Sequence, residues 1–245
     1  MPQQTLFNTM RMSGSTWQGQ RDSNPRLSVL ETDALPTELY PFRREGFASI
    51  AVMPQDYTFS PWRKTVSRIP YPDPASLPEE LNSFTNRLAP LNIFRMLGHA
   101  PHLVKPFVGL GTAFLQQGKL DPVTRECVIL RVGYVSHAKY ETAQHEAIGR
   151  KLGMSDELFE ALRLEPQSDL LTHEQKLVVS FTDHLVTHAH PSDGALKPAL
   201  KHFGPALLEE LVLLIGYYMM VCRFLETFGV EVEEGGPKGT EIKLD

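Results

Sequence analysis

Apolar side chains recur at the spacing of a helix face through most of the chain after residue 68. In segment 78–89, Leu81, Phe84 and Leu88 lie three or four residues apart and the residues between them are mostly polar. The same period, bounded by proline, glycine or capping residues, predicts further helices at 91–100, 101–117, 122–135, 138–152, 156–162, 173–188, 193–203 and 206–228. Strands do not alternate with these helices, so the pattern predicts an all-α main domain.

Two of the predicted helix starts carry strong signals. Asp121 offers an acceptor side chain at the cap and is followed by Pro122, which suits the first helical position. Thr172 and Gln175 have the spacing of a capping box. The run CVILRV within 122–135 is rich in β-branched residues and could form a buried strand, but the Asp-Pro start and the helical surroundings favour a helix.

Residues 1–67 differ from the rest of the chain, because they carry several prolines, polar runs and only one strand-like piece, 47–53. A segment of this kind buries little surface by itself. We therefore expect an irregular N-terminal extension at 1–67, a helical domain at 68–232 and a charged C-terminal tail at 233–245. The extension is expected to drape over the helical domain or a neighbouring subunit, where its aromatic side chains anchor it or line a pocket.

Composition excludes several classes of function. A net charge of −5 and a pI near 6.0 give no general attraction to nucleic acid or to anionic lipid. Cys127 and Cys222 are far apart in sequence and both lie in apolar helical segments, so they predict neither a disulfide framework nor a zinc site. A reducing compartment fits this cysteine usage.

The chain shows no secretory signal in its first residues. Its longest apolar run, 211–221, is shorter than a bilayer span requires and is flanked by Glu209, Glu210 and Arg223. We therefore expect a buried helix, no membrane partner and a cytoplasmic location.

The candidate chemistry lies in the adjacent predicted helices 122–135 and 138–152. Glu126 interrupts a run that should be buried, and Glu141 and His145 stand four residues apart on one helix face. Two carboxylates and an imidazole can move protons, because one carboxylate orients or charges the histidine while the other transfers the proton. Without further information, a Glu-His pair at this spacing is more often part of a solvated helix face.

Other histidines carry weaker signals. His184 and His188 have a spacing that metal sites use, but no acidic residue completes the pattern, so no metal is predicted. His99 and His102 flank a proline-broken helix junction and could belong to a pocket wall.

The string RECVILRVGYVSHAKYETAQHEAIGRKLGMSDE resembles the signature region of the carboxymuconolactone decarboxylase family, which also contains the alkylhydroperoxidase-D-like (AhpD-like) proteins. The resemblance extends over about 68–232 and implies an AhpD-like helical bundle. The peroxidase branch of the family has a glutamate, a Cys-x-x-Cys pair and a histidine. In this chain the glutamate matches Glu126 and the histidine matches His145, but the cysteine positions fall on Ala138 and Glu141. Without these thiols, thiol peroxidase activity is excluded by that mechanism.

Tyr140, Glu141 and His145 are similar to the Tyr-Glu-x-x-x-His pattern of the decarboxylase-like branch. The resemblance implies a decarboxylation without a cofactor on a small, cyclic, carboxylated or lactone-bearing compound. In such a reaction the carbonyl of the substrate takes up the electrons as an enolate. His145 as imidazolium would then protonate carbon, with Glu141 or Glu126 holding its tautomer and raising its pKa.

Four further residues are expected to bind the substrate. Tyr140 could donate a hydrogen bond to the developing oxyanion, and His137 is either a second proton donor or a helix-terminal cation. Arg131 and Arg95 are the candidates for holding a substrate carboxylate, although Arg131 could equally pair with Glu126.

Other functions remain open on the same residues. The acid and base could instead catalyse isomerisation, lactone opening or cyclisation, or the chain could be a non-catalytic scaffold or binding protein. The resemblance implies a homo-oligomer, a trimer or a hexamer. The aromatic-rich extension suggests a pocket remodelled for a bulkier, aromatic or polyketide-like substrate, as in secondary metabolism.

Overall fold

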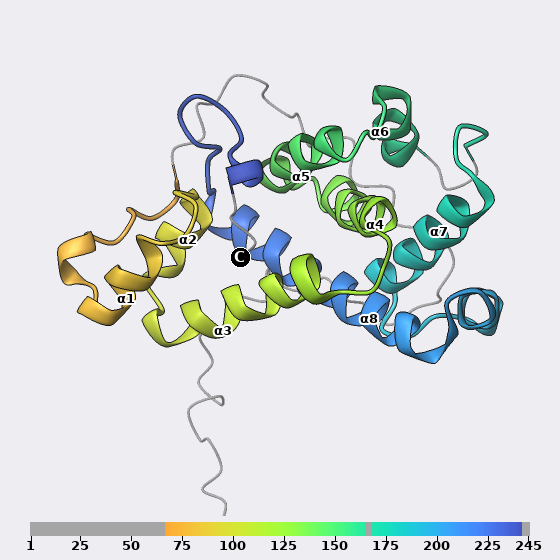
Figure 1. Ribbon diagram of the computed structural model, residues 1–245, viewed down its shortest axis with the longest axis horizontal. Helices are drawn as coiled ribbons and strands as arrows, with labels where there is room; N and C mark the ends of the chain where they lie inside the picture. Colours follow the sequence, from red (N-terminus) through yellow and green to blue (C-terminus); the bar gives the residue numbers. More distant parts are fainter. Residues whose placement is uncertain (1–66, 165–167, 242–245) are drawn as a thin grey trace, which may run out of the picture. The chain divides into compact units, whose positions relative to one another are not determined.

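The computed structural model describes residues 67–164 and 168–241, and within these ranges the regular structure is helical without strands (Figure 1). The prediction of an all-α domain is confirmed. The strand-like piece at 47–53 and the rest of the N-terminal extension lie outside the described residues. The α-helices are α1 (Glu79–Thr85), α2 (Asn92–Leu97), α3 (Pro101–Thr112), α4 (Pro122–Val135), α5 (Lys139–Lys151), α6 (Asp156–Arg163), α7 (His173–Thr187) and α8 (Asp193–Phe228). Short helical turns lie at η3 (Pro74–Ser76), η4 (Ala113–Gln117) and η5 (Gly239–Glu241).

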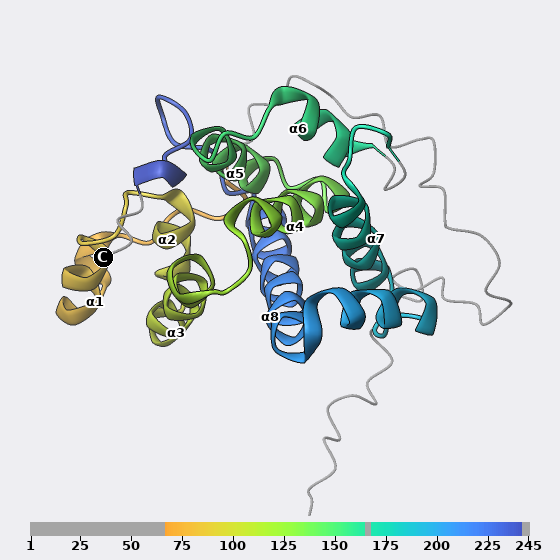
Figure 2. The ribbon, with the colours of Figure 1, turned by 45° about the vertical axis from the view of Figure 1, so that its right-hand side comes forward.

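Helix α4 is the centre of the domain and contacts α5, α6, α7 and α8 (Figure 1, Figure 2). Every residue in 124–133 is buried, so this helix has no solvent face. A helix that is surrounded on all sides needs apolar residues around its whole circumference. This requirement explains why the run CVILRV lacks amphipathic character and yet forms a helix.

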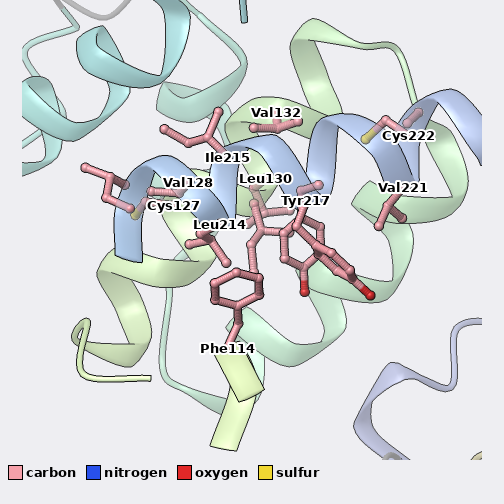
Figure 3. Close-up of a cluster of buried hydrophobic side chains, with 14 of the residues drawn as sticks. Phe114, Cys127, Val128, Leu130, Val132, Leu214, Ile215, Tyr217, Val221 and Cys222 are labelled. Atoms are coloured by element: carbon pink, nitrogen blue, oxygen red, sulfur yellow. The ribbon is translucent and has the colours of Figure 1, made fainter. Parts of the chain in front are cut away.

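Helix α8 supplies the second half of the core. Gly204 has φ 70°, and this left-handed residue divides the helix into two arms that are visible in Figure 2. In the longer arm, Leu214 and Ile215 belong to the same buried cluster as Val128 and Leu130 of α4 (Figure 3). By length and composition alone α8 could cross a membrane. In its most apolar stretch of 18 residues, 44% of the stretch is buried inside this chain.

The caps predicted at Asp121, Ser155 and Thr172 form, whereas Ser192, also expected to cap a helix, makes no side-chain capping bond at the start of α8. The side chain of Asp121 accepts a hydrogen bond from the backbone of Thr124, and Ser155 caps α6 in the same way. Thr172 and Gln175 make both bonds of the capping box. These local polar contacts fix where the helices around the core begin.

Two helix ends differ from the predictions. Helix α1 stops at Thr85 rather than near residue 89, because the chain tightens there into turns in which Arg87 and Leu88 donate to carbonyls only three residues back. The helix predicted at 101–117 ends in the π-helical turn η4. Gly118 follows it with an ordinary φ of −56°, and its role is steric, because a Cβ there would lie 2.4 Å from the carbonyl oxygen of Phe114.

Gly111 in α3 allows the hydroxyl of Tyr217 to pack against the helix backbone. A Cβ at Gly111 would lie 2.6 Å from that oxygen, and Tyr217 cannot move easily because it is wedged against Phe107 and Phe114. We expect Gly111→Ala to lower the free energy of unfolding by about 1–3 kcal/mol. Chemical denaturation measures this change.

Gly109 provides the matched control, since nothing lies within 4 Å of a Cβ built at that position. Gly109→Ala should raise the free energy of unfolding by about 0.5–1 kcal/mol, as expected for glycine replacement in an exposed helix. Equal effects of the two substitutions would contradict the steric argument.

Candidate active site

His145 lies between two carboxylates from adjacent helices. Its Nδ1 is 2.6 Å from Glu126 Oε2, across from α5 to α4, and its Nε2 is 3.1 Å from Glu141 Oε1, one turn earlier on α5. The structure therefore brings together the three residues that the sequence analysis named as catalytic. Both ring nitrogens face an acceptor, which suits an imidazolium that donates from each of them.

The three side chains are almost completely buried. Glu126 has no exposed surface, and Glu141 and His145 are 4% and 6% exposed. A buried carboxylate is costly unless it is paired and hydrogen-bonded. Glu141 has additional support because it lies in the first turn of α5, where the helix dipole favours a negative charge.

The charge state of His145 follows from its neighbours. Burial by itself lowers the pKa of this imidazole, but Glu126 and Glu141 outweigh burial and raise it to about 10. His145 is therefore protonated at neutral pH. The edge of its ring meets Tyr218 at a centroid distance of 5.2 Å and an angle of 90°.

A cavity of about 120 Å³ opens beside this cluster. Glu141 and His145 form its polar wall, and the rest of the lining is mostly aliphatic and aromatic, including Phe94, Phe107 and Tyr217. Most of the other polar groups in this wall are bound elsewhere: the hydroxyl of Tyr217, for example, donates to the carbonyl oxygen of Phe107. The cavity thus suits a small, largely apolar molecule that meets one acid and one imidazolium.

Tyr218 has a hydroxyl that stays available next to His145. It lines the cavity next to His145, and its hydroxyl makes no hydrogen bond to any residue that the structure describes. Burial raises the pKa of Tyr218 well above its ordinary value, so it remains a neutral donor. The sequence analysis missed this residue because it lies in the apolar run of α8, more than seventy positions after His145.

Tyr140, which the sequence analysis proposed as an oxyanion donor, has its hydroxyl bound elsewhere. Its ring lines the cavity, but the hydroxyl donates to Glu233 Oε1 at 2.7 Å. Glu233 also accepts hydrogen bonds from the backbone of Asn92 and from the side-chain amide of Gln144, at 2.6 Å each. Gln144 in turn accepts a hydrogen bond from the backbone of Gly239, which lines the cavity. The segment 233–241, expected to be a charged tail, thus forms part of the cavity wall.

The two arginines predicted to anchor a substrate carboxylate are not in the cavity wall. Arg131 donates from Nε and Nη2 to both carboxylate oxygens of Asp183 and from Nη1 to the carbonyls of Leu162 and Leu164. The guanidinium of Arg131 is therefore occupied by Asp183 and the two carbonyls, not by Glu126, and it links α4 to α7 and to the end of α6. We therefore withdraw its assignment to substrate binding.

Arg95 donates to the side chain of Asn92 and stacks on the ring of Tyr71 at 4.4 Å, outside the cavity wall. His137 is exposed in the turn between α4 and α5, with φ 54°. It does not line the cavity, so its position does not suit a second proton donor. The arginine in the cavity wall is instead Arg87, an exposed residue after α1 that makes no ion pair within the described part of the chain.

The cysteines are not placed for redox chemistry. Cys127 and Cys222 are free and buried in the core, where burial raises the pKa of the Cys127 thiol to about 12. Burial also raises the pKa of Cys222. Among residues 67–164 and 168–241, no group of three or more His, Cys, Asp or Glu side chains could hold a metal ion.

Comparison with known proteins agrees with this picture of the fold. Residues 101–166 match the model of the carboxymuconolactone decarboxylase family. An uncharacterized peroxidase-related protein with an alkylhydroperoxidase AhpD core, from Ralstonia eutropha JMP134, is similar in structure, with a TM-score of 0.58, 19% identity and coverage of 69% of this chain and 93% of that chain. An uncharacterized peroxidase-related protein from Silicibacter sp. TM1040 gives a TM-score of 0.56 at 18% identity and covers 71% and 94%.

A protein of unknown function from Agrobacterium tumefaciens gives a TM-score of 0.52 at 16% identity and covers 55% of this chain and 93% of that chain. No curated protein matches the chain. At these identities the likeness concerns the fold, which is AhpD-like.

The raised pKa of His145 can be measured directly. In an NMR titration its ring protons should titrate near pH 10, well above the ordinary value of about 6.5, and Glu126→Gln should lower the midpoint. Because the folded-state pKa lies above the unfolded one, His145 stabilises the fold fully below about pH 6.5, and this stabilisation is lost as pH rises through 10. A midpoint near 6.5 would show that the carboxylates do not hold the proton.

The Glu233 network should carry measurable stability. Glu233→Ala leaves Asn92, Tyr140 and Gln144 without their acceptor, so we expect the free energy of unfolding to fall by about 2–4 kcal/mol. Glu234→Ala is the matched control, because the adjacent Glu234 is exposed and should change stability by less than about 0.5 kcal/mol. Equal effects in urea denaturation would mean that the segment 233–241 is not held by Glu233.

Proposed function

The chain belongs to the carboxymuconolactone decarboxylase family through residues 101–166 and to the AhpD-like superfamily by its fold, and from this premise we propose a cofactor-independent carbon–carbon lyase. Its substrate is a small cyclic compound that carries a carboxylate or a lactone, and its reaction is a decarboxylation. The single observation that supports this proposal best is a buried imidazolium, His145, held between Glu126 and Glu141 at the wall of a small apolar cavity.

The proposed reaction needs two things from the protein. When the bond between the ring carbon and the carboxylate breaks, CO₂ leaves and the electron pair moves through the adjacent unsaturation to a carbonyl oxygen of the substrate. The developing oxyanion needs a donor, and Tyr218 places a free hydroxyl in the cavity wall beside His145. The carbanion equivalent then takes a proton at carbon.

His145 is the proton source for that last step. Its imidazolium gives one proton to carbon, either directly or through Glu141 in the cavity wall, and the neutral ring regains a proton from solvent after the product leaves. Glu126, fully buried behind the ring, holds the tautomer and favours the charged form. Glu126 is thus a positioning residue, whereas His145 and Glu141 meet the substrate.

An isomerase is the second candidate function, because a base and an acid share the cavity wall. Glu141 could remove a proton from one carbon while His145 delivers one to another, with no loss of CO₂. Lactone opening or cyclisation would use the same pair. The products of the reaction distinguish these alternatives from decarboxylation.

Assembly and location remain proposals as well. Helix α8 exposes Val212, Leu213 and Met220, and α3 exposes Leu103 and Leu110, which favours a homo-oligomer that covers these side chains. Trimers and hexamers are the expected sizes. The many charged groups on the remaining surface and the buried inner face of α8 favour a cytoplasmic protein over one anchored by that helix.

The proposed function predicts a defined pattern of variant activities. On a panel of cyclic β-keto acids and carboxylated lactones, the protein should release CO₂ from at least one compound, and His145→Gln should lower kcat at least about 100-fold. Tyr218→Phe keeps the ring and removes the hydroxyl, so it should lower kcat by about 100- to 1000-fold, as loss of an oxyanion donor does. Detection of ¹³CO₂ from labelled substrate measures both effects.

Lys201→Met, on the exposed side of α8 and outside the cavity wall, is the control for nonspecific loss of activity. Conversion of a substrate without CO₂ release would favour the isomerase. Unchanged turnover in the His145 and Tyr218 variants would overturn both assignments.

A further inference from the structure

A second pocket adjoins the catalytic cavity and shares part of its wall. Its volume is about 200 Å³, and Leu115, Ile148 and Gly239 line both spaces. The remaining lining residues are Arg125, Lys151, Leu152 and Thr240. Among the side chains that the structure describes in its wall, two are cationic and none is acidic, although the whole chain carries a net charge of −5.

Arg125 is a buried cation whose donors are mostly unused. The residue is 8% exposed, and within the described residues its guanidinium makes one hydrogen bond, from Nη1 to the carbonyl oxygen of Leu115 at 3.3 Å. Its Nε is buried without a hydrogen-bond partner and lies 3.5 Å from Glu126 Oε1, which also lacks one. A guanidinium has five N–H donors, and leaving them unsatisfied in a buried place costs free energy.

Lys151 brings a second cation to the same pocket from the last turn of α5. Its Nζ donates to the carbonyl oxygen of Thr240 at 3.2 Å, which keeps the ammonium next to η5 and leaves two of its donors. The pocket wall therefore offers two kinds of contact. Arg125 and Lys151 supply a guanidinium and an ammonium, and Leu115, Ile148 and Leu152 supply aliphatic side chains.

We propose that this pocket is a binding site for a small amphiphilic carboxylate, separate from the catalytic cavity. The carboxylate binds the free N–H groups of Arg125, for which its planar geometry is matched, and is supported by Lys151. The apolar body of the ligand packs on Leu115, Ile148 and Leu152. The site takes a monocarboxylate of roughly the size of benzoate, because an engineered cavity of about 150 Å³ in another protein holds one benzene ring.

Occupancy of this site is transmitted to the catalytic cluster. Arg125 is a second cation next to Glu126, and Glu126 holds His145. A carboxylate bound to Arg125 competes with Glu126 for its positive charge, so the electrostatic surroundings of His145 change although the ligand does not touch it. The site is therefore a place from which a carboxylate product or effector can act on the proton donor.

Binding of benzoate and of benzamide to the full chain, measured by calorimetry, tests the proposal. Benzamide has the same shape without the charge. We expect saturable benzoate binding, at least tenfold weaker binding of benzamide, and a shift of the His145 ring resonances on addition of benzoate. Arg125→Lys keeps the charge but loses the planar donor pair, and Lys151→Met keeps the length but loses the charge, so each should weaken benzoate binding about tenfold.

Control variants locate the site. Arg87→Met removes the cation of the catalytic cavity and Lys201→Met removes an exposed lysine that lines neither space, and both should bind benzoate like the unaltered protein. Because Lys151 is exposed at the end of α5, its variant keeps the test valid even if Arg125→Lys does not fold.

Three results would overturn the proposal: no saturable binding of benzoate, equal binding of benzoate and benzamide, or binding that is lost in Arg87→Met and kept in Lys151→Met. The last result would place the carboxylate in the catalytic cavity instead. These binding measurements do not depend on turnover. The carboxylate site can therefore be disproved while the proposed decarboxylation stands, and the decarboxylation can be disproved while the carboxylate site stands.

Discussion

The burial of Glu126 is the constraint on which the rest of the domain depends. A carboxylate with no exposed surface in the middle of the most buried helix would cost several kcal/mol without a partner. Its partner, His145, comes from the next helix, so α4 and α5 must be held at a fixed separation and rotation. Gly133 allows their close approach, because a Cβ there would lie 2.8 Å from Cγ2 of Thr142. The strained turn at His137, with φ 54°, belongs to the same connection.

The protein stabilises two buried acids near the cavity in two different ways. Glu126 is balanced by a charge, and the result is a protonated histidine with a proton to give. Glu233 is balanced by neutral donors from Asn92, Tyr140 and Gln144, and the result is a rigid attachment of the segment after α8. The first arrangement can change its protonation during a reaction. Protonation of Glu233 would weaken the hydrogen bonds that hold the cavity wall. We therefore assign the chemistry to the cluster of Glu126 and His145 and a structural role to Glu233.

Much of the fold could be predicted from the sequence because helix period, caps and breakers act locally. Asp121 and Thr172 mark helix starts without any tertiary information. The three residues named as catalytic could also be predicted, since a glutamate inside an apolar run must have a buried partner and Glu141 and His145 share a helix face. The partners of the arginines could not be predicted in this way. Arg131 meets Asp183, 52 residues later, and no spacing rule connects them.

Tyr218, Arg87 and Glu233 were missed for the same reason. Each reaches the cavity wall or its support from a segment far from α4 and α5 in sequence, and each looks ordinary in its own segment: a tyrosine among apolar residues, an arginine after a short helix, and a glutamate in a charged tail. The signal that could have found Glu233 is weak. Glu233 follows Gly229, a left-handed helix end at which the chain leaves the direction of α8.

The distribution of charge around the cavity suits a reaction in which a negative charge moves. His145 and Arg125 both lie next to Glu126, whereas Glu141 is the acidic side chain in the cavity wall, so a substrate carboxylate that enters next to Glu141 is repelled in the ground state. In the proposed reaction this carboxylate leaves as neutral CO₂ and its charge passes to a carbonyl oxygen, which Tyr218 can bind. The repulsion is therefore relieved on the way to the transition state rather than increased. An anionic substrate still has to be attracted to the cavity. Arg87 in the cavity wall supplies a positive charge for this, because it makes no ion pair with Glu126 or Glu141.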